Sequence, residues 1–213
     1  MTLASCLENE SLQNFLVIIE DPVSNQPRKY EISSKITYED YKDELKRQNE
    51  FVYGPEKVDL CIITLNVART GILFAKISYD VQSPIGGDHV TAVSWGPTRI
   101  HAKPTFPSYA KLEIIKKQLC CDALEKYCLM NKKLTWSNKV FCLKRTSAQV
   151  SSTSVSNVDF GGPVLNSADE VIGILLHRED NKSSKNFQQL GRLPIPVLRL
   201  GFYKQFIKRY ITY

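Results

Sequence analysis

The chain has 213 residues, of which 43% are hydrophobic and 23% are charged, and 28 Lys and Arg against 22 Asp and Glu give a net charge of +6. These values are typical of a globular chain and exclude a collagen-like protein, a small disulfide-stabilised protein and a wholly disordered chain. The basic pairs are scattered and no aromatic-rich RNA motif accompanies them, so we expect no nucleic-acid binding.

Apolar runs are short throughout the chain. None approaches the roughly 18 residues that a membrane-spanning helix needs, so we expect no membrane span. The first six residues lack the basic head and apolar stretch of a signal peptide, and we expect no export signal in this sequence.

Strand-like segments follow one another from the start of the chain. Asn14–Glu20 is rich in β-branched residues and ends at Asp21-Pro22, which predicts a strand followed by a turn. The continuous apolar run Val58–Leu65 predicts a buried strand. Further strands are expected at Arg28–Ile32, Gly71–Ile77, His89–Ser94, Lys139–Lys144 and Val171–His177. Many short strands separated by turn residues predict an all-β barrel or sandwich.

Two later segments carry helical spacing instead. Apolar residues within Tyr109–Met130 are partly helix-spaced, which predicts a helix. Phe202, Phe206 and Tyr210 are four apart with basic residues opposite them, so we expect an amphipathic C-terminal helix whose aromatic stripe lies in the core. The Ser/Thr-rich stretch Ala148–Asn157 is expected to form an exposed loop.

The six cysteines offer no metal site, because they contain no Cys-x-x-Cys pair and no histidine at zinc-ligand spacing. We expect neither a metal nor a cofactor. Cys61 lies in a predicted strand and is expected to be a buried free thiol. Asn9 and Asn181 begin Asn-x-Ser triplets, which are acceptors for glycosylation in secreted proteins.

Five segments carry a family resemblance, in family order. Asn157-Val-Asp-Phe-Gly-Gly-Pro-Val164 resembles the Gly-Asp-Ser-Gly-Gly-Pro loop of the nucleophile in chymotrypsin-like serine peptidases. Val58–Leu65 resembles the strand of the triad aspartate, and Thr2-Leu-Ala-Ser-Cys6 resembles the segment of the triad histidine. Ser94-Trp-Gly-Pro-Thr98 and Leu193–Ile211 resemble the opening of the second barrel and the closing strand with its helix.

The resemblance implies a trypsin-like fold over the whole chain, residues 1–213. Its fold class would be all-β, a double six-stranded β-barrel with a C-terminal α-helix. Residues 1–85 would form a partial first barrel, and residues 86–213 would form the second barrel and the helix. The family's opening strands have no counterpart here, so we expect a truncated chain or a barrel completed by something else. Exposed sheet edges would favour aggregation.

At the catalytic positions the resemblance implies a degenerate triad. Ser5 stands at the histidine position, Asp59 keeps the aspartate position, and Phe160 stands at the nucleophile position. A serine hydroxyl cannot act as a general base near neutral pH, and a phenyl ring has no heteroatom to attack a carbonyl carbon. We therefore expect no peptidase activity.

The resemblance also assigns the positions around the nucleophile. Val158 occupies the position of an oxyanion-hole glycine, and the specificity pocket would include Ser154 and His177. A disulfide common in the family's second barrel implies that Cys128 pairs with Cys142.

Three functions stay open. The first is an inactive, insect-like serine protease homologue, extracellular in its full-length form, which binds or regulates peptidases, zymogens or receptors. The second is a serine-type endopeptidase with residual activity, which would need a nucleophile such as Ser154 or Ser156. The third is a non-functional product of a truncated gene.

Overall fold

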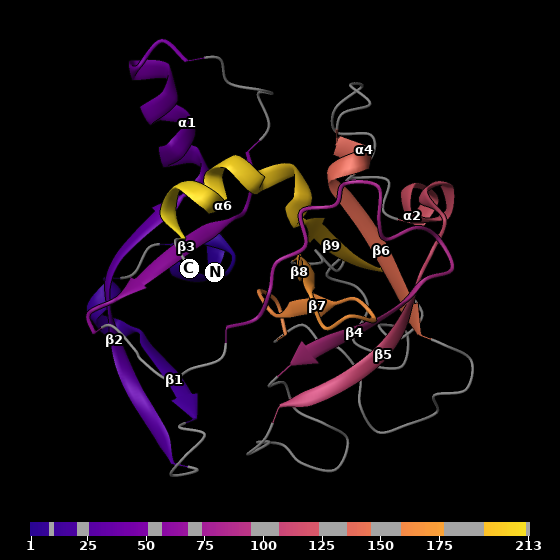
Figure 1. The fold of residues 1–213 in the computed structure, drawn as a ribbon, viewed down its shortest axis with the longest axis horizontal. Helices are drawn as coiled ribbons and strands as arrows, with labels where there is room; N and C mark the ends of the chain where they lie inside the picture. Colours follow the sequence, from indigo (N-terminus) through magenta and orange to yellow (C-terminus); the bar gives the residue numbers. More distant parts are fainter. Residues whose placement is uncertain are drawn as a thin grey trace, which may run out of the picture. The chain divides into compact units, whose positions relative to one another are not determined.

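The computed structural model of the chain describes residues 1–8, 11–20, 26–50, 57–67, 74–94, 107–123, 136–145, 159–176 and 194–211. The chain divides into two compact units, residues 1–74 with 205–213 and residues 75–204. Figure 1 shows strands β1 to β3, which belong to the first unit, and strands β4 to β9, which belong to the second. The resemblance placed the C-terminal helix with the second barrel, whereas residues 205–213 group with the first unit.

The second unit contains a closed barrel of six antiparallel strands in the order β4-β5-β6-β9-β8-β7. The bounds are β4 His89–Ser94, β5 Ser108–Ile114, β6 Val140–Arg145, β7 Pro163–Leu165, β8 Val171–Leu175 and β9 Ile195–Arg199. Successive side chains of a strand point to opposite faces, and in β4 and β5 the buried residues alternate accordingly. The closed barrel confirms the all-β class.

Close packing between β8 and β9 depends on Gly173. A Cβ atom at this position would lie 2.4 Å from Cγ1 of Val197 and 2.7 Å from the carbonyl oxygen of Leu198. Glycine in a strand interior often marks such an approach of two backbones. Gly173 therefore lets the two strands of the barrel wall come together.

Strand β5 corrects one prediction. The helix predicted for Tyr109–Met130 is wrong for residues 109–114, which belong to β5, and helix α2 covers Lys117–Ala123. Ala110, Leu112 and Ile114 are buried at alternate positions, and β5 pairs with β4 along its length. A short strand followed after two residues by a short helix produces apolar spacings that imitate one longer helix.

The first unit contains a three-stranded antiparallel sheet in the order β1-β2-β3. The strands are β1 Leu16–Glu20, β2 Pro27–Thr37 and β3 Cys61–Leu65, and two 3-10 turns, η1 Ala4–Leu7 and η2 Leu12–Asn14, precede them. Its core consists of residues from these turns and strands: Ala4, Leu7, Leu12, Phe15, Val17, Ile32, Cys61 and Ile63. This open sheet is the incomplete first barrel that the resemblance implied.

Helix α1, Tyr38–Arg47, lies between β2 and β3 and was not expected from the sequence. Its start is fixed by a capping box, in which the Asp40 N–H donates to the Thr37 hydroxyl (3.1 Å) and the Thr37 N–H donates to the Asp40 carboxylate (2.9 Å). Such reciprocal bonds satisfy backbone donors that a helix start leaves open. Acidic residues in the first turn and Lys46 and Arg47 in the last turn suit the helix dipole.

The C-terminal segment begins with the 3-10 turn η3, Leu200–Tyr203, and continues as helix α6, Lys204–Tyr210. The predicted C-terminal helix is confirmed, but only part of the predicted aromatic stripe lies in the core. Phe206 is fully buried, whereas Phe202 lies in the 3-10 turn and is 38% exposed. The change of helical period before Lys204 turns Phe202 away from the line of Phe206.

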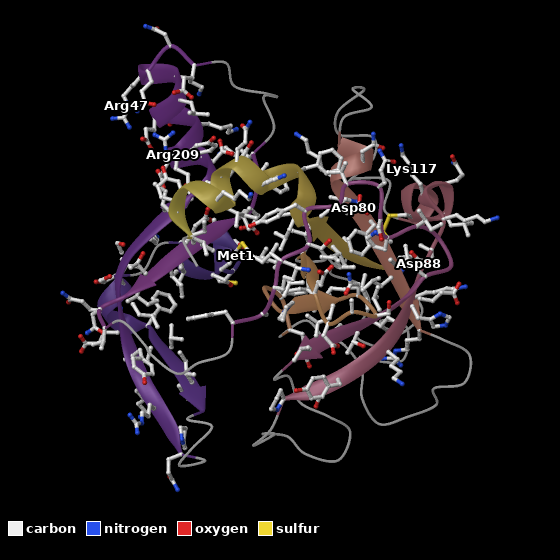
Figure 2. All side chains as sticks on the ribbon, viewed as in Figure 1. Met1, Arg47, Asp80, Asp88, Lys117 and Arg209 are labelled. Carbon is white, nitrogen blue, oxygen red and sulfur yellow. A yellow bond between two sulfur atoms is a disulfide. The ribbon has the colours of Figure 1, made fainter. Side chains whose placement is uncertain are left out.

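Helices α1 and α6 are joined by a polar network at one end of their contact. The Arg209 guanidinium, labelled in Figure 2, donates to one oxygen of the Glu44 carboxylate, and the Tyr210 hydroxyl donates to the other, each at 2.6 Å. These hydrogen bonds hold the pKa of Glu44 below its ordinary value of 4.5, and the bond from Tyr210 has the largest effect. Burial and Glu44 raise the pKa of Tyr210 to about 12, so the hydroxyl keeps its proton in acid and neutral solution.

We expect the Glu44→Gln variant to show a weaker acid dependence of stability than the wild type. A carboxyl with a lowered pKa stabilises the fold above its ordinary pKa, and this contribution is lost as the pH falls through the lowered value. Thermal unfolding measured by circular dichroism from about pH 5 to about pH 3 should give melting temperatures that converge at the acid end. Tyr210→Phe should weaken the dependence in the same direction, and parallel curves for all three proteins would contradict this role of Glu44.

Candidate degenerate catalytic site

Ser5 and Asp59, which the sequence assigned to two triad positions, lie in contact in the first unit. The Ser5 backbone N–H donates to Oδ1 of Asp59 at 2.7 Å, and its hydroxyl donates to Oδ2 at 2.6 Å. Both carboxylate oxygens of Asp59 are therefore occupied by one residue 54 positions earlier in the chain. The resemblance placed these two residues together, and the structure does the same.

Backbone pairing explains why the two segments meet. Thr2 and Cys61 form an isolated antiparallel bridge, with N–H to carbonyl distances of 2.9 and 2.8 Å. Turn η1 then begins at Ala4 and directs Ser5 to Asp59, which lies just before β3. Ser5 is exposed and Asp59 is half-buried, so the pair lies at the surface of the unit.

The two free thiols near this pair are not activated. Burial raises the pKa of the Cys6 thiol, and the charge of Asp59 raises it further. Burial also raises the pKa of the Cys61 thiol. A nucleophilic cysteine needs a lowered pKa so that the thiolate is populated. Neither thiol therefore has the lowered pKa that populates a thiolate. The prediction that Cys61 is a buried free cysteine is confirmed.

Phe160 lies in the second unit, in a tight turn that leads into β7. Gly161 has a φ of 83°, in the left-handed region that favours glycine, and its N–H donates to the Leu175 carbonyl at 2.9 Å. A Cβ atom on Gly162 would lie 2.7 Å from the carbonyl oxygen of Val93. The turn therefore needs both glycines, and it holds a half-exposed phenyl ring at the position that the resemblance assigns to the nucleophile.

Asp159 precedes this ring and is 3% exposed. Its carbonyl oxygen accepts from the Gly162 N–H at 3.1 Å, which closes the turn around Phe160. The remaining predicted site residues, Val158, Ser154, His177, Asn9 and Asn181, lie outside the described residues.

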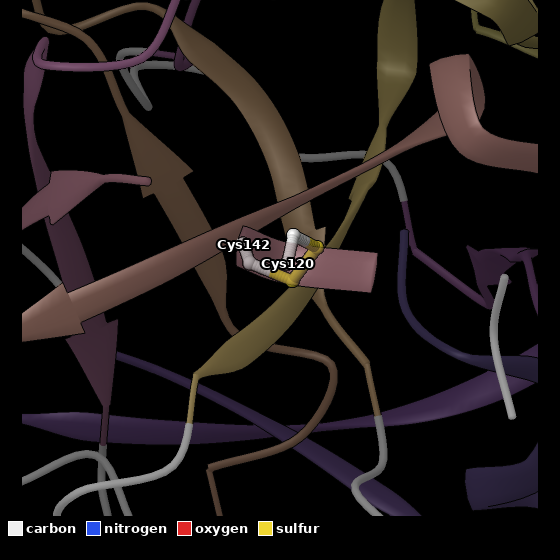
Figure 3. Close-up of a disulfide and its surroundings, with 2 residues drawn as sticks. All are labelled: Cys120 and Cys142. Carbon is white, nitrogen blue, oxygen red and sulfur yellow. A yellow bond between two sulfur atoms is a disulfide. The ribbon is translucent and has the colours of Figure 1, made fainter. Parts of the chain in front are cut away.

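The disulfide corrects another prediction. Cys142 pairs with Cys120 and not with Cys128, which lies outside the described residues. Figure 3 shows Cys120 on helix α2 bonded to Cys142 on strand β6. The Ile115 N–H donates to the Cys142 carbonyl at 3.0 Å, so helix α2 begins next to β6 and brings the two Cα atoms to 5.6 Å. That separation suits a disulfide.

Metal and membrane features are not found in the described part of the chain. No group of three or more His, Cys, Asp or Glu side chains there is placed to hold a metal ion. None of the helices described has the length and apolar character that crossing a membrane requires.

The sequence profile of the family described as Trypsin matches residues 1–191. The chain belongs to the trypsin family. No curated protein matches the sequence. Because the family profile covers most of the chain, with residues from both units, the chain is a trypsin-like peptidase domain.

Solved structures of the same fold are similar at low identity. Neuropsin from mouse brain matches with 18% identity and a TM-score of 0.66, covering 98% of this chain and 82% of its own. An inactivated protease paralogue of the scabies mite, S-D1, matches with 14% identity and a TM-score of 0.65, covering 97% and 80%. A mutant of human heparin binding protein matches with 13% identity and a TM-score of 0.63, covering 98% and 79%. These likenesses confirm the trypsin fold.

Proposed function

We propose that this protein is a non-catalytic member of the trypsin family that acts as a protein-binding or regulatory module in extracellular proteolytic pathways. The observation that carries the proposal is the Ser5–Asp59 pair together with Phe160. Peptide hydrolysis by this family needs a base that takes a proton from a nucleophile, and an aspartate that orients the base.

The Ser5–Asp59 pair supports the loss of the base. In the triad, the aspartate accepts from an imidazole N–H and stabilises the imidazolium that forms. Here both carboxylate oxygens of Asp59 accept from Ser5. An imidazole bonded to the aspartate through one nitrogen keeps its second nitrogen to take a proton from the nucleophile. The Ser5 hydroxyl has no such second basic atom. Asp59 then serves to anchor turn η1 and not to orient a base.

Phe160 supports the loss of the nucleophile. Its ring cannot form an acyl-enzyme, and it occupies more volume than a serine side chain. Removing the triad of a serine peptidase costs on the order of 10⁶-fold in rate. The turn around Phe160 nevertheless keeps its glycines and its hydrogen bonds, so the scaffold persists without this chemistry.

A binding role fits the remaining features. The closed barrel and its disulfide keep a stable scaffold, and disulfides persist in oxidising, extracellular compartments. Two solved chains with the same fold are described as inactivated protease paralogues of the scabies mite. The fold is thus compatible with an inactive protein, whose partners would be proteins such as peptidases, zymogens or receptors.

Labelling with a fluorophosphonate probe tests the proposal. We expect no labelling of the purified natural chain, because the probe reports only an activated serine nucleophile. The Ser5→His/Phe160→Ser double variant should label if the substitutions alone abolish the chemistry. An active trypsin is the positive control, and near-ultraviolet circular dichroism verifies that each protein is folded.

Labelling of the natural chain would overturn the proposal. In that case Ser154→Ala and Ser156→Ala identify the reacting serine, and loss of labelling in one of them would support a peptidase of altered mechanism. Failure of the double variant to label leaves the inactivity of the natural chain in place and attributes it to more than these two positions.

A further inference from the structure

Strand β1 is an edge of the three-stranded sheet and exposes apolar side chains. Within the described part of the chain, it pairs with β2 alone and shows no bulge. Leu16 is 51% exposed and Ile18 is 60% exposed. Natural proteins protect free edges with lysine, proline or bulges. Strand β1, of sequence LVIIE, has none of these and carries its single charge at its end.

The two faces of β1 differ in what they contact. Phe15 and Val17 pack against the core of the first unit. Leu16 and Ile18 lie on the other face, where Leu16 is paired with Glu31 and Ile18 with Lys29 of β2. This outer face therefore has an apolar edge bordered by one acidic and one basic side chain.

We propose that β1 pairs antiparallel with β1 of a second copy of this chain, with the two-fold axis at Val17. A two-fold interface uses the same patch on both subunits, so the patch must complement itself. With the axis at Val17, Leu16 of each copy lies opposite Ile18 of the other. Four apolar side chains then meet at the centre of the outer face, at the distances of directly opposite strand neighbours.

The flanking charges select this register. With the axis at Val17, each row across the joined sheet runs from Glu31 of one copy to Lys29 of the other, so opposite charges border the apolar centre. With the axis at Ile18, Ile18 of the two copies would lie opposite each other, and the two lysines at position 29 would share a row. That register places like charges in one row.

Sedimentation velocity of the full chain over a range of concentrations tests the proposal. The Cys6→Ala background avoids cross-linking through the exposed thiol. We expect a dimer, and we expect Ile18→Lys to weaken self-association by about 100-fold, because two lysines enter one interface. The matched control is Ile85→Lys, at a similarly exposed side chain (64%) in the second unit, which should leave the dimer unchanged.

A charge exchange tests the register. Ile18→Glu alone should give a monomer, and the double variant Leu16→Lys/Ile18→Glu should restore the dimer, because each introduced lysine then faces an introduced glutamate of the other copy. In the register centred on Ile18, the two introduced glutamates would face each other and the double variant would stay monomeric. A monomeric parent chain, open-ended oligomers, a dimer that survives Ile18→Lys, or a double variant without recovery would each overturn the proposal.

Discussion

Replacing Cys120 or Cys142 with alanine is expected to lower the free energy of unfolding by about 3 kcal/mol. The two residues are 22 positions apart, and closing a loop of about this length in the unfolded chain costs an entropy of that size. The bridge also fixes helix α2 to the middle of the barrel strand β6, where Cys142 is fully buried. Urea unfolding under non-reducing conditions, followed by circular dichroism, measures the loss.

The double variant Cys120→Ala/Cys142→Ala should lose about as much as either single variant, because one bond is removed in all three cases. Cys128→Ala is the matched control for the pairing that the family resemblance implied, and it should change the free energy of unfolding by less than about 0.5 kcal/mol. A large loss for Cys128→Ala with no loss for Cys120→Ala would restore the pairing of Cys128 with Cys142.

Several strands were predictable because each has a clear period and clear punctuation. The predicted strand His89–Ser94 coincides with β4, and the predicted apolar run Val58–Leu65 contains β3. Burial on one face in β4 leaves the alternating pattern that the sequence displays. In β5 the same alternation was hidden, because the helix that follows it at Lys117 adds apolar residues at helical spacing.

Helix α1 escaped prediction although its signals are present. Thr37 and Asp40 form a capping box, and Lys46 and Arg47 end the helix. The helix has few apolar residues, and its contact with the core depends on Tyr38 and Tyr41, which meet α6 from the other end of the chain. When the apolar face of a helix is narrow, few apolar residues recur at helical spacing in the sequence. The capping residues were therefore the main sequence signal for this helix.

The candidate site was predicted in part. The order of the family motifs along the chain assigned Ser5 and Asp59 to two triad positions, which lie side by side in the family. The hydrogen bonds between the two residues agree with that placement. The bond geometry itself was not predictable, because it requires the Thr2–Cys61 bridge to set the register of the two segments. The Cys120–Cys142 bridge was missed because the boundary between β5 and α2, which puts Cys120 beside β6, was not recognised.

Truncating Phe206 to alanine is expected to cost about 3 to 5 kcal/mol of unfolding free energy, as is usual for a buried phenylalanine. The ring is fully buried and lies 5.4 Å from the ring centre of Tyr38, 5.3 Å from that of Tyr41 and 5.5 Å from that of Tyr210. The contacts with Tyr38 and Tyr210 are edge-to-face, and such pairs add to the stabilisation from burial of apolar area. Removing the ring leaves a cavity between α1 and α6 that three rigid aromatic side chains cannot easily fill.

Phe202→Ala is the matched control, since it removes the same ring from the same segment at a position that is 38% exposed. We expect it to cost less than about half as much as Phe206→Ala, because partly exposed atoms lose less transfer free energy and leave no closed cavity. Phe206→Leu should lie between the two, because it keeps most of the volume and loses the aromatic contacts. Equal losses for Phe202→Ala and Phe206→Ala in urea unfolding would show that the contact between α1 and α6 does not depend on the ring of Phe206.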